Sequence, residues 1–105
     1  MIYGFNEKKE KVEIQDAVIM STIQTTISSI HAGVSWANYI DAENYQIDGY
    51  KFLGIIGSDG GRGVIISDWA IVTLTQEQLM VNFYNPTGAD RTNVNVNIYG
   101  LYVKV

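Results

Sequence analysis

The C-terminal stretch 93–105, Asn-Val-Asn-Val-Asn-Ile-Tyr-Gly-Leu-Tyr-Val-Lys-Val, decides the fold class. Its first six residues alternate asparagine with Val94, Val96 and Ile98, and this period of two is typical of a β-strand with one buried face. After Gly100 the apolar residues fall on the opposite phase. We therefore expect a β-bulge at Gly100, which would return the later apolar residues to the core.

Strand-like segments recur along the rest of the chain. Residues 50–56 and 64–66 are apolar runs on either side of the glycine-rich stretch 57–63, a pattern that predicts a β-hairpin. Further strand candidates with apolar alternation are 36–41, 69–75 and 79–84. Short strands separated by turn signals at roughly ten-residue spacing predict an all-β fold, a single β-sandwich or jelly roll of about seven to eight antiparallel strands.

The segment 12–30 admits two interpretations. Its isoleucines recur at helical spacing, at Ile19, Ile23, Ile27 and Ile30, which would place them on one stripe of a helix. The same segment is dense in β-branched residues and serine, which disfavour a helix. We predict one or two strands here, with a helix as the alternative.

Length and composition fit one domain. The chain has 105 residues, no cysteine and a net charge of −4. We expect the domain to span residues 12–105 and residues 1–11 to form an N-terminal segment or linker, because 6–11 is a run of charged residues. We expect no secretory signal at this charged N-terminus and no membrane insertion, since no apolar stretch approaches the length of a membrane span. The sparse basic residues disfavour nucleic-acid binding.

Catalytic motifs are missing from the sequence. The single histidine, His31, has no nucleophile motif to serve, because Gly-x-Ser-x-Gly does not occur. The glycine-rich stretch 57–63 lacks the Gly-Lys-Ser/Thr ending of a phosphate-binding loop. Asp41, Glu43 and Asp48 share one polar segment, but their spacing matches no calcium loop. We predict a protein that is not an enzyme and that uses no cofactor and no metal.

Aromatic and polar residues of the expected loops are the candidates for ligand binding. Tyrosine and tryptophan present an apolar face with a polar edge, which suits sugar rings and protein surfaces. We expect Tyr39 and Tyr45, which flank the acidic segment, to be exposed. The candidate ligand-binding residues are Trp36, Tyr39, Tyr45, Arg62, Asn85, Asp90 and Arg91. The asparagines of 93–97 are expected to face solvent, with burial against a symmetry mate as the alternative.

Several short motifs resemble one family. The Gly-Tyr-Lys-Phe-Leu-Gly of 49–54 is similar to a Gly-Tyr-Lys-x-Leu-Gly signature near the C-termini of many phage and prophage tail proteins. The closing segments 79–85, 94–96 and 101–104, the last reading Leu-Tyr-Val-Lys, resemble the final strands of the same group, and 2–13 resembles the start of their domains. These motifs cover more than half the chain.

The resemblance implies a jelly-roll-like module of a tail fibre or baseplate, present in the virion or encoded by a prophage. Such modules are commonly homotrimers that contact other tail proteins and bind host-surface glycans. It implies no catalytic residue. The alternative is a monomeric carbohydrate-binding or adhesion module of a bacterial surface protein, and oligomeric state separates the two hypotheses.

Overall fold

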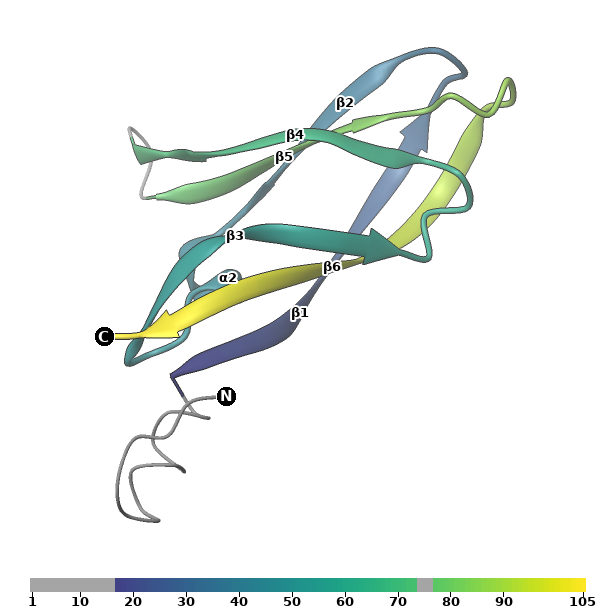
Figure 1. The fold of residues 1–105 in the computed structure, drawn as a ribbon. Helices are drawn as coiled ribbons and strands as arrows, with labels where there is room; N and C mark the ends of the chain where they lie inside the picture. The colour runs from purple at the N-terminus through teal and green to yellow at the C-terminus, as the bar shows by residue number, and fades with distance from the viewer. Residues whose placement is uncertain (1–16, 74–76) are drawn as a thin grey trace.

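The computed structural model describes residues 17–73 and 77–105, which form an all-β structure (Figure 1). The linker predicted for residues 1–11 lies outside these ranges. The elements are β1 (Val18–Ile30), β2 (Ser35–Ile40), the single-turn helix α2 (Ala42–Tyr45), β3 (Tyr50–Asp59), β4 (Ile65–Val72), β5 (Gln78–Tyr84) and β6 (Arg91–Lys104). The predicted fold class is confirmed, although the described residues contain six strands rather than seven or eight. No helix of the described ranges has the length and apolarity needed to cross a membrane.

Two antiparallel three-stranded sheets pack face to face as a β-sandwich. Sheet A has the order β1-β6-β3 and sheet B the order β2-β5-β4, so the central strands are β6 and β5. Figure 1 shows β4, β5 and part of β2 forming one layer above β3, β6 and β1. The side chains between the layers form the hydrophobic core, which includes Ile23, Ile27, Leu79, Val81, Phe83, Val94, Val96 and Ile98.

Most of the segment with two possible interpretations, 12–30, is one strand, β1, and its residues 12–16 lie outside the described ranges. β1 pairs with β6 in one constant register, from Val18 opposite Val103 to Ile30 opposite Arg91. Ile23 and Ile27 lie on the core face, where β-branched side chains pack well against neighbours on a pleated surface. The prediction of strand over helix is therefore confirmed.

The hairpin predicted around the glycine-rich stretch 57–63 is wrong. β3 pairs with β6 in sheet A, whereas β4 pairs with β5 in sheet B, so the connection crosses from one sheet to the other. Gly60, Arg62 and Gly63 all have positive φ angles, and Val64 is buried in the core at the end of the loop. Because β3 and β4 belong to different sheets, the loop between them passes from one layer of the sandwich to the other.

The bulge predicted at Gly100 is also wrong. β6 continues without a shift against β1, with Gly100 opposite Ser21. The irregularities lie in β3, between Phe52 and Gly54 and between Ile55 and Gly57. Gly100 lies on the core face, where a Cβ would be 3.0 Å from Phe52 Cε1. Because β6 has no bulge against β1, Leu101 and Val103 point to the outer face of sheet A.

Candidate ligand-binding surface

An open hollow of about 430 Å³ lies between the edges of the two sheets, where β1 and β2 run beside each other. Its lining combines hydroxyl, amide and carboxylate groups with one tyrosine. The residues are Thr22, Ile23, Gln24, Thr25, Tyr39, Ile40, Asp41 and Asn44. We call this hollow the edge groove. Tyr39 is 55% exposed, so a large part of its surface is available for contact.

A chain of hydrogen bonds joins the two strands beside the edge groove. The Asn38 side-chain amide of β2 donates to Thr25 Oγ1 at 3.0 Å and to the Thr26 carbonyl oxygen at 3.1 Å, both on β1. Trp36 Nε1 donates to Asn38 Oδ1 at 2.8 Å. The Trp36 indole is therefore held in one orientation although 52% of the residue is exposed. The structure thus places both aromatic candidates of β2, Trp36 and Tyr39, on accessible surface.

A second hollow, of about 450 Å³, lies on the outer face of sheet A and shares Gln24 and Thr25 with the edge groove. Its other lining residues are Thr26, Asn95, Val96 and Asn97. Gln24 Nε2 donates to Asn97 Oδ1 at 3.1 Å, and Thr26 Oγ1 donates to Asn95 Oδ1 at 2.8 Å. Polar groups therefore continue around β1 from its edge to its outer face.

The polar row on the outer face ends at a tyrosine–carboxylate pair. Asn97 Nδ2 donates to Asp59 Oδ1 at 3.2 Å, and the Tyr99 hydroxyl donates to Asp59 Oδ2 at 2.8 Å. This hydrogen bond to the carboxylate raises the pKa of Tyr99 above its usual value of 10.0, with smaller contributions from burial and from the charge of Asp59. Asn93 and Asn95 are exposed and Asn97 is half-buried, which agrees with the solvent-facing asparagine row expected from the sequence.

The exposure expected of Tyr45 is not found. Tyr45 is 3% exposed because the α2 turn directs its ring into the sandwich, where it lies edge-to-face with Phe52 at a centroid distance of 5.3 Å. Its hydroxyl donates to the Glu77 carbonyl oxygen at 2.6 Å. The Tyr102 hydroxyl donates in turn to the Tyr45 carbonyl oxygen, and burial raises the pKa of Tyr102, with a smaller effect of Tyr45. Tyr45 therefore supports the core and offers no face to a ligand.

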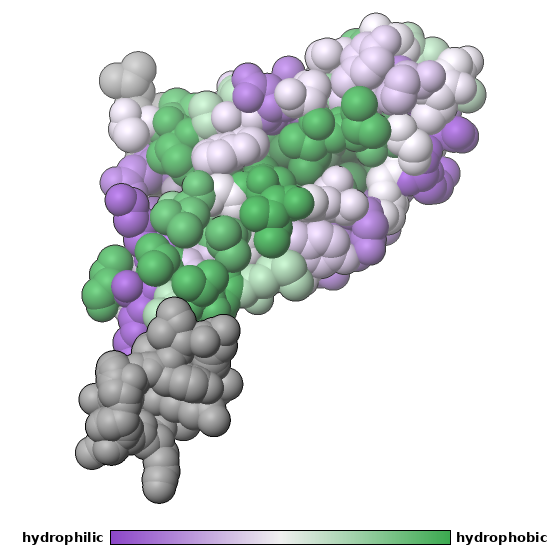
Figure 2. Space-filling view, in the orientation of Figure 1, coloured by the Kyte–Doolittle hydropathy of each residue, from purple (hydrophilic) through white to green (hydrophobic). Residues whose placement is uncertain are grey.

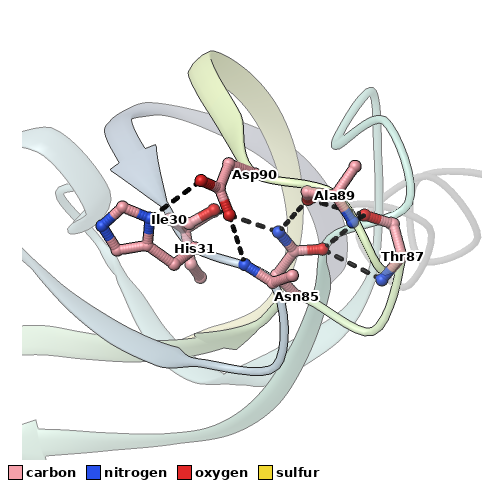
Figure 3. Close-up of polar contacts among 7 residues, drawn as sticks. Ile30, His31, Asn85, Thr87, Ala89 and Asp90 are labelled. Atoms are coloured by element: carbon pink, nitrogen blue, oxygen red, sulfur yellow. Dashed lines mark hydrogen bonds and ion pairs between the residues drawn. The ribbon is translucent and has the colours of Figure 1, made fainter.

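Asn85 is buried and organises the loop between β5 and β6 (Figure 3). Its side-chain oxygen accepts from the Thr87 backbone N–H at 3.0 Å and from the Thr87 hydroxyl at 2.7 Å. Its amide nitrogen donates to the carbonyl oxygens of Ile30 and Ala89. Every polar atom of this side chain is thus used within the protein, and Asn85 has a structural role in this loop.

The remaining candidates lie at the same end of the sandwich as Asn85. Asp90 accepts a hydrogen bond from the Ala32 backbone N–H at 2.9 Å and pairs with His31 at 3.1 Å. Arg62 donates to the Thr92 carbonyl oxygen, and Arg91 is half-buried at the start of β6. Figure 3 shows Asp90 directed at His31 and the backbone nitrogen beside it, so its carboxylate is already engaged.

The structure therefore separates the sequence candidates into two groups. Trp36 and Tyr39 contribute accessible aromatic surface, whereas Asn85 and Asp90 are committed to loop structure. Sequence reasoning did not identify the polar residues around β1 as part of a candidate binding surface. Alternation within β1 could have indicated that its even-numbered residues share a face, but only the register with β6 shows which asparagines they meet.

The carboxylates of the described residues do not form a metal-binding cluster. Within residues 17–73 and 77–105, no three His, Asp or Glu side chains gather closely enough to hold a metal ion. Asp41 accepts a hydrogen bond from Gln78 Nε2 at 2.8 Å rather than meeting another carboxylate. The surface combines side chains that can form hydrogen bonds with the exposed rings of Trp36 and Tyr39.

Comparison of the chain with protein-family models, with curated proteins and with solved structures found no match.

Proposed function

We propose that this chain is a non-catalytic receptor-binding or structural module of a phage or prophage tail, which assembles as a homotrimer and binds a host-surface glycan. The observation that carries glycan binding is the edge groove, an open polar hollow with the exposed ring of Tyr39 in its wall. The tail context and the trimer rest on the sequence resemblance described above.

The chemistry of the edge groove suits a sugar better than an apolar ligand. A sugar presents hydroxyl groups at its edge and C–H groups on its faces. The amides of Gln24 and Asn44 and the carboxylate of Asp41 can exchange hydrogen bonds with hydroxyls, and the Tyr39 ring can pack against a C–H face. An enclosed, mainly apolar cavity, which is typical of sites for small apolar ligands, is not what this groove provides.

A monomeric carbohydrate-binding or adhesion module of a bacterial surface protein is the second candidate. One chain supplies the eight residues that line the edge groove, so a single copy offers this surface to a ligand. The two candidates share a ligand class but differ in oligomeric state.

A glycan array followed by calorimetry on the best-binding glycan tests the proposed site. Tyr39→Ala is expected to weaken binding at least tenfold, about 1.4 kcal/mol, because it removes the ring that contacts the sugar. Tyr84→Ala is the matched control, since Tyr84 lines none of the hollows described here. Circular dichroism verifies that both variants are folded.

Equal weakening by the two substitutions, or binding that survives Tyr39→Ala unchanged, would remove the edge groove from consideration. Recovery of a shortened glycan after incubation would contradict the non-catalytic part of the proposal.

A further inference from the structure

The edge groove continues onto the outer face of sheet A. Gln24 and Thr25 line both the groove and the second hollow, so the two form one polar surface that we call the β1 track. Most of its side chains carry uncharged amide or hydroxyl groups, and Tyr39 is the only exposed large hydrophobic residue of the described ranges that lines it. Figure 2 shows other hydrophobic residues gathered over β3 and the C-terminal end of β6. The β1 track therefore suits a polar ligand.

One charged side chain lines the β1 track among the described residues, and it is a carboxylate. Asp41 is exposed at the edge-groove end of the track. Its Oδ1 accepts a hydrogen bond from Gln78 Nε2 at 2.8 Å, which holds the carboxylate in place. A carboxylate can accept several hydrogen bonds, so Asp41 can also accept one from a sugar hydroxyl. The same negative charge repels a ligand that is itself an anion.

No basic side chain of the described residues lines the β1 track. Arg62 donates to the Thr92 carbonyl oxygen, and Lys51 lines a different hollow. Protein sites for carboxylate or phosphate groups typically contain arginine or lysine, which neutralise the charge and donate hydrogen bonds. The net charge of the whole chain, −4, also has the sign of an acidic sugar. An acidic glycan in the track would thus face Asp41 and find no cationic partner among the described residues.

We infer that the β1 track selects glycans without acidic groups, and that Asp41 is the residue that excludes acidic ones. The inference rests on the proposed function for glycan binding and deepens it by stating which glycans the site accepts.

Asp41→Asn is the variant that tests this selectivity. Asparagine keeps the shape of the side chain and an oxygen that can accept from Gln78, but it carries no charge. Asp41 precedes α2 without forming a side-chain cap, so the substitution breaks no capping bond. Asp48→Asn is the matched control, because it changes the net charge by the same amount and Asp48 is exposed in a different hollow.

A glycan array probed with the full-length chain identifies the ligand. The array carries uncharged oligosaccharides, each paired with a counterpart in which one hydroxymethyl group is oxidised to a carboxylate. Calorimetry on the best-binding pair then gives the ratio of the two affinities for the wild type and for both variants.

We expect the wild type to bind the uncharged member of the pair about tenfold more tightly than the acidic member. Asp41→Asn should reduce this ratio by about threefold or more, because the repulsion acts at contact distance. Asp48→Asn should leave the ratio unchanged, since exposed charges farther from the ligand are screened by salt. Raising the salt concentration to about 1 M should also lower the wild-type ratio, because it screens the repulsion by Asp41.

Two outcomes would overturn the inference and leave the proposed function in place. One is an acidic member that binds as tightly as its uncharged counterpart; loss of this binding in Tyr39→Ala would show that the edge groove still holds the glycan. The other is an equal change of the affinity ratio in Asp41→Asn and Asp48→Asn, which would assign the selectivity to the overall charge of the chain. An array without any bound glycan would overturn the proposed function and the inference together.

Discussion

The side-chain amide of Asn85 donates a hydrogen bond to the backbone oxygen of Ile30 across 3.0 Å, although 55 positions separate the two residues. Ile30 is the last residue of β1 in sheet A, and Asn85 directly follows β5 in sheet B. Two backbone bonds accompany this contact, from Gly33 N to Asn85 O at 2.8 Å and from Asn85 N to Val34 O at 3.2 Å. Asn85 therefore ties the two sheets together at one end of the sandwich.

Replacement of Asn85 is expected to be costly. Asn85→Ala removes the donor to the carbonyl oxygens of Ile30 and Ala89 and the acceptor for Thr87, in a site that is fully buried. Leaving buried polar groups without partners costs about 1–3 kcal/mol each, so we expect a loss of about 3 kcal/mol in the free energy of unfolding. Urea denaturation measures it.

Asn85→Asp and Asn44→Ala complete this test. The aspartate should be at least as destabilising as the alanine, because it directs a negative charge at two carbonyl oxygens. Asn44 is exposed in the edge groove, and its replacement should change the unfolding free energy by less than about 0.5 kcal/mol. An Asn85→Ala protein as stable as the wild type would show that the loop is held by its backbone bonds alone.

The local alternation of apolar and polar residues allowed the strands to be predicted. It did not show which strands pair with each other. The period of two in 93–98 depends only on which side chains are buried, and β6 contains it. Whether the glycine-rich stretch 57–63 turns back as a hairpin or crosses between sheets depends on which strands the flanking segments pair with, and this pairing is a property of the assembled sheets. The phase change at Gly100 was misinterpreted because the sequence does not show that Leu101 and Val103 lie on the outer face of sheet A, which follows from the unbroken register of β6 with β1.

The candidate site was predicted in part. Tyr39 was expected to be exposed because it flanks an acidic segment, and Trp36 was a candidate as an aromatic residue; both are more than half exposed. Tyr45 was wrongly expected to be exposed. It lies in a single helical turn, Ala42–Tyr45, in which its side chain is buried. The contribution of Gln24 could not be found, because it depends on pairing between positions 73 residues apart.

Gly54 is predicted to tolerate no side chain. A Cβ at this position would lie 2.8 Å from Trp69 Cζ2, and its φ of +154° is one that L-residues rarely adopt. Trp69 in turn packs edge-to-face on Phe52 at 5.7 Å, so it cannot move away without disturbing the core. We expect Gly54→Ala to lower the free energy of unfolding by about 1–3 kcal/mol.

Gly57→Ala is the control for this substitution. Gly57 lies in the same strand, and a Cβ there would have an ordinary contact of 3.7 Å with the Tyr99 ring. Its replacement should change stability by less than about 1 kcal/mol. Chemical denaturation of the two variants side by side gives the comparison, and equal effects would mean that Trp69 is free to shift.

The hydrogen bonds of Asp90 with the Ala32 backbone N–H and with His31 predict a pH dependence of stability with a definite sign. The hydrogen bond from the Ala32 backbone N–H, and secondly that from His31, hold the pKa of Asp90 below its usual value of 3.8. A carboxyl group with a depressed pKa in the folded state stabilises the protein fully above its unfolded value and loses that contribution as the pH falls through the lower, folded value. The wild type should therefore unfold at a higher temperature than Asp90→Asn above pH 3.8, and the difference should disappear in stronger acid.

Thermal unfolding followed across the acid range measures this difference. Glu43→Gln provides the control, since Glu43 is exposed and no hydrogen bond or ion pair is found for it within residues 17–73 and 77–105. Because Asp90 is well exposed, salt should weaken its charge interaction with His31 but leave the hydrogen bond from Ala32 in place. A difference that persists in high salt would thus assign the effect to the backbone hydrogen bond, and a difference that grows as the pH falls would contradict the depressed pKa.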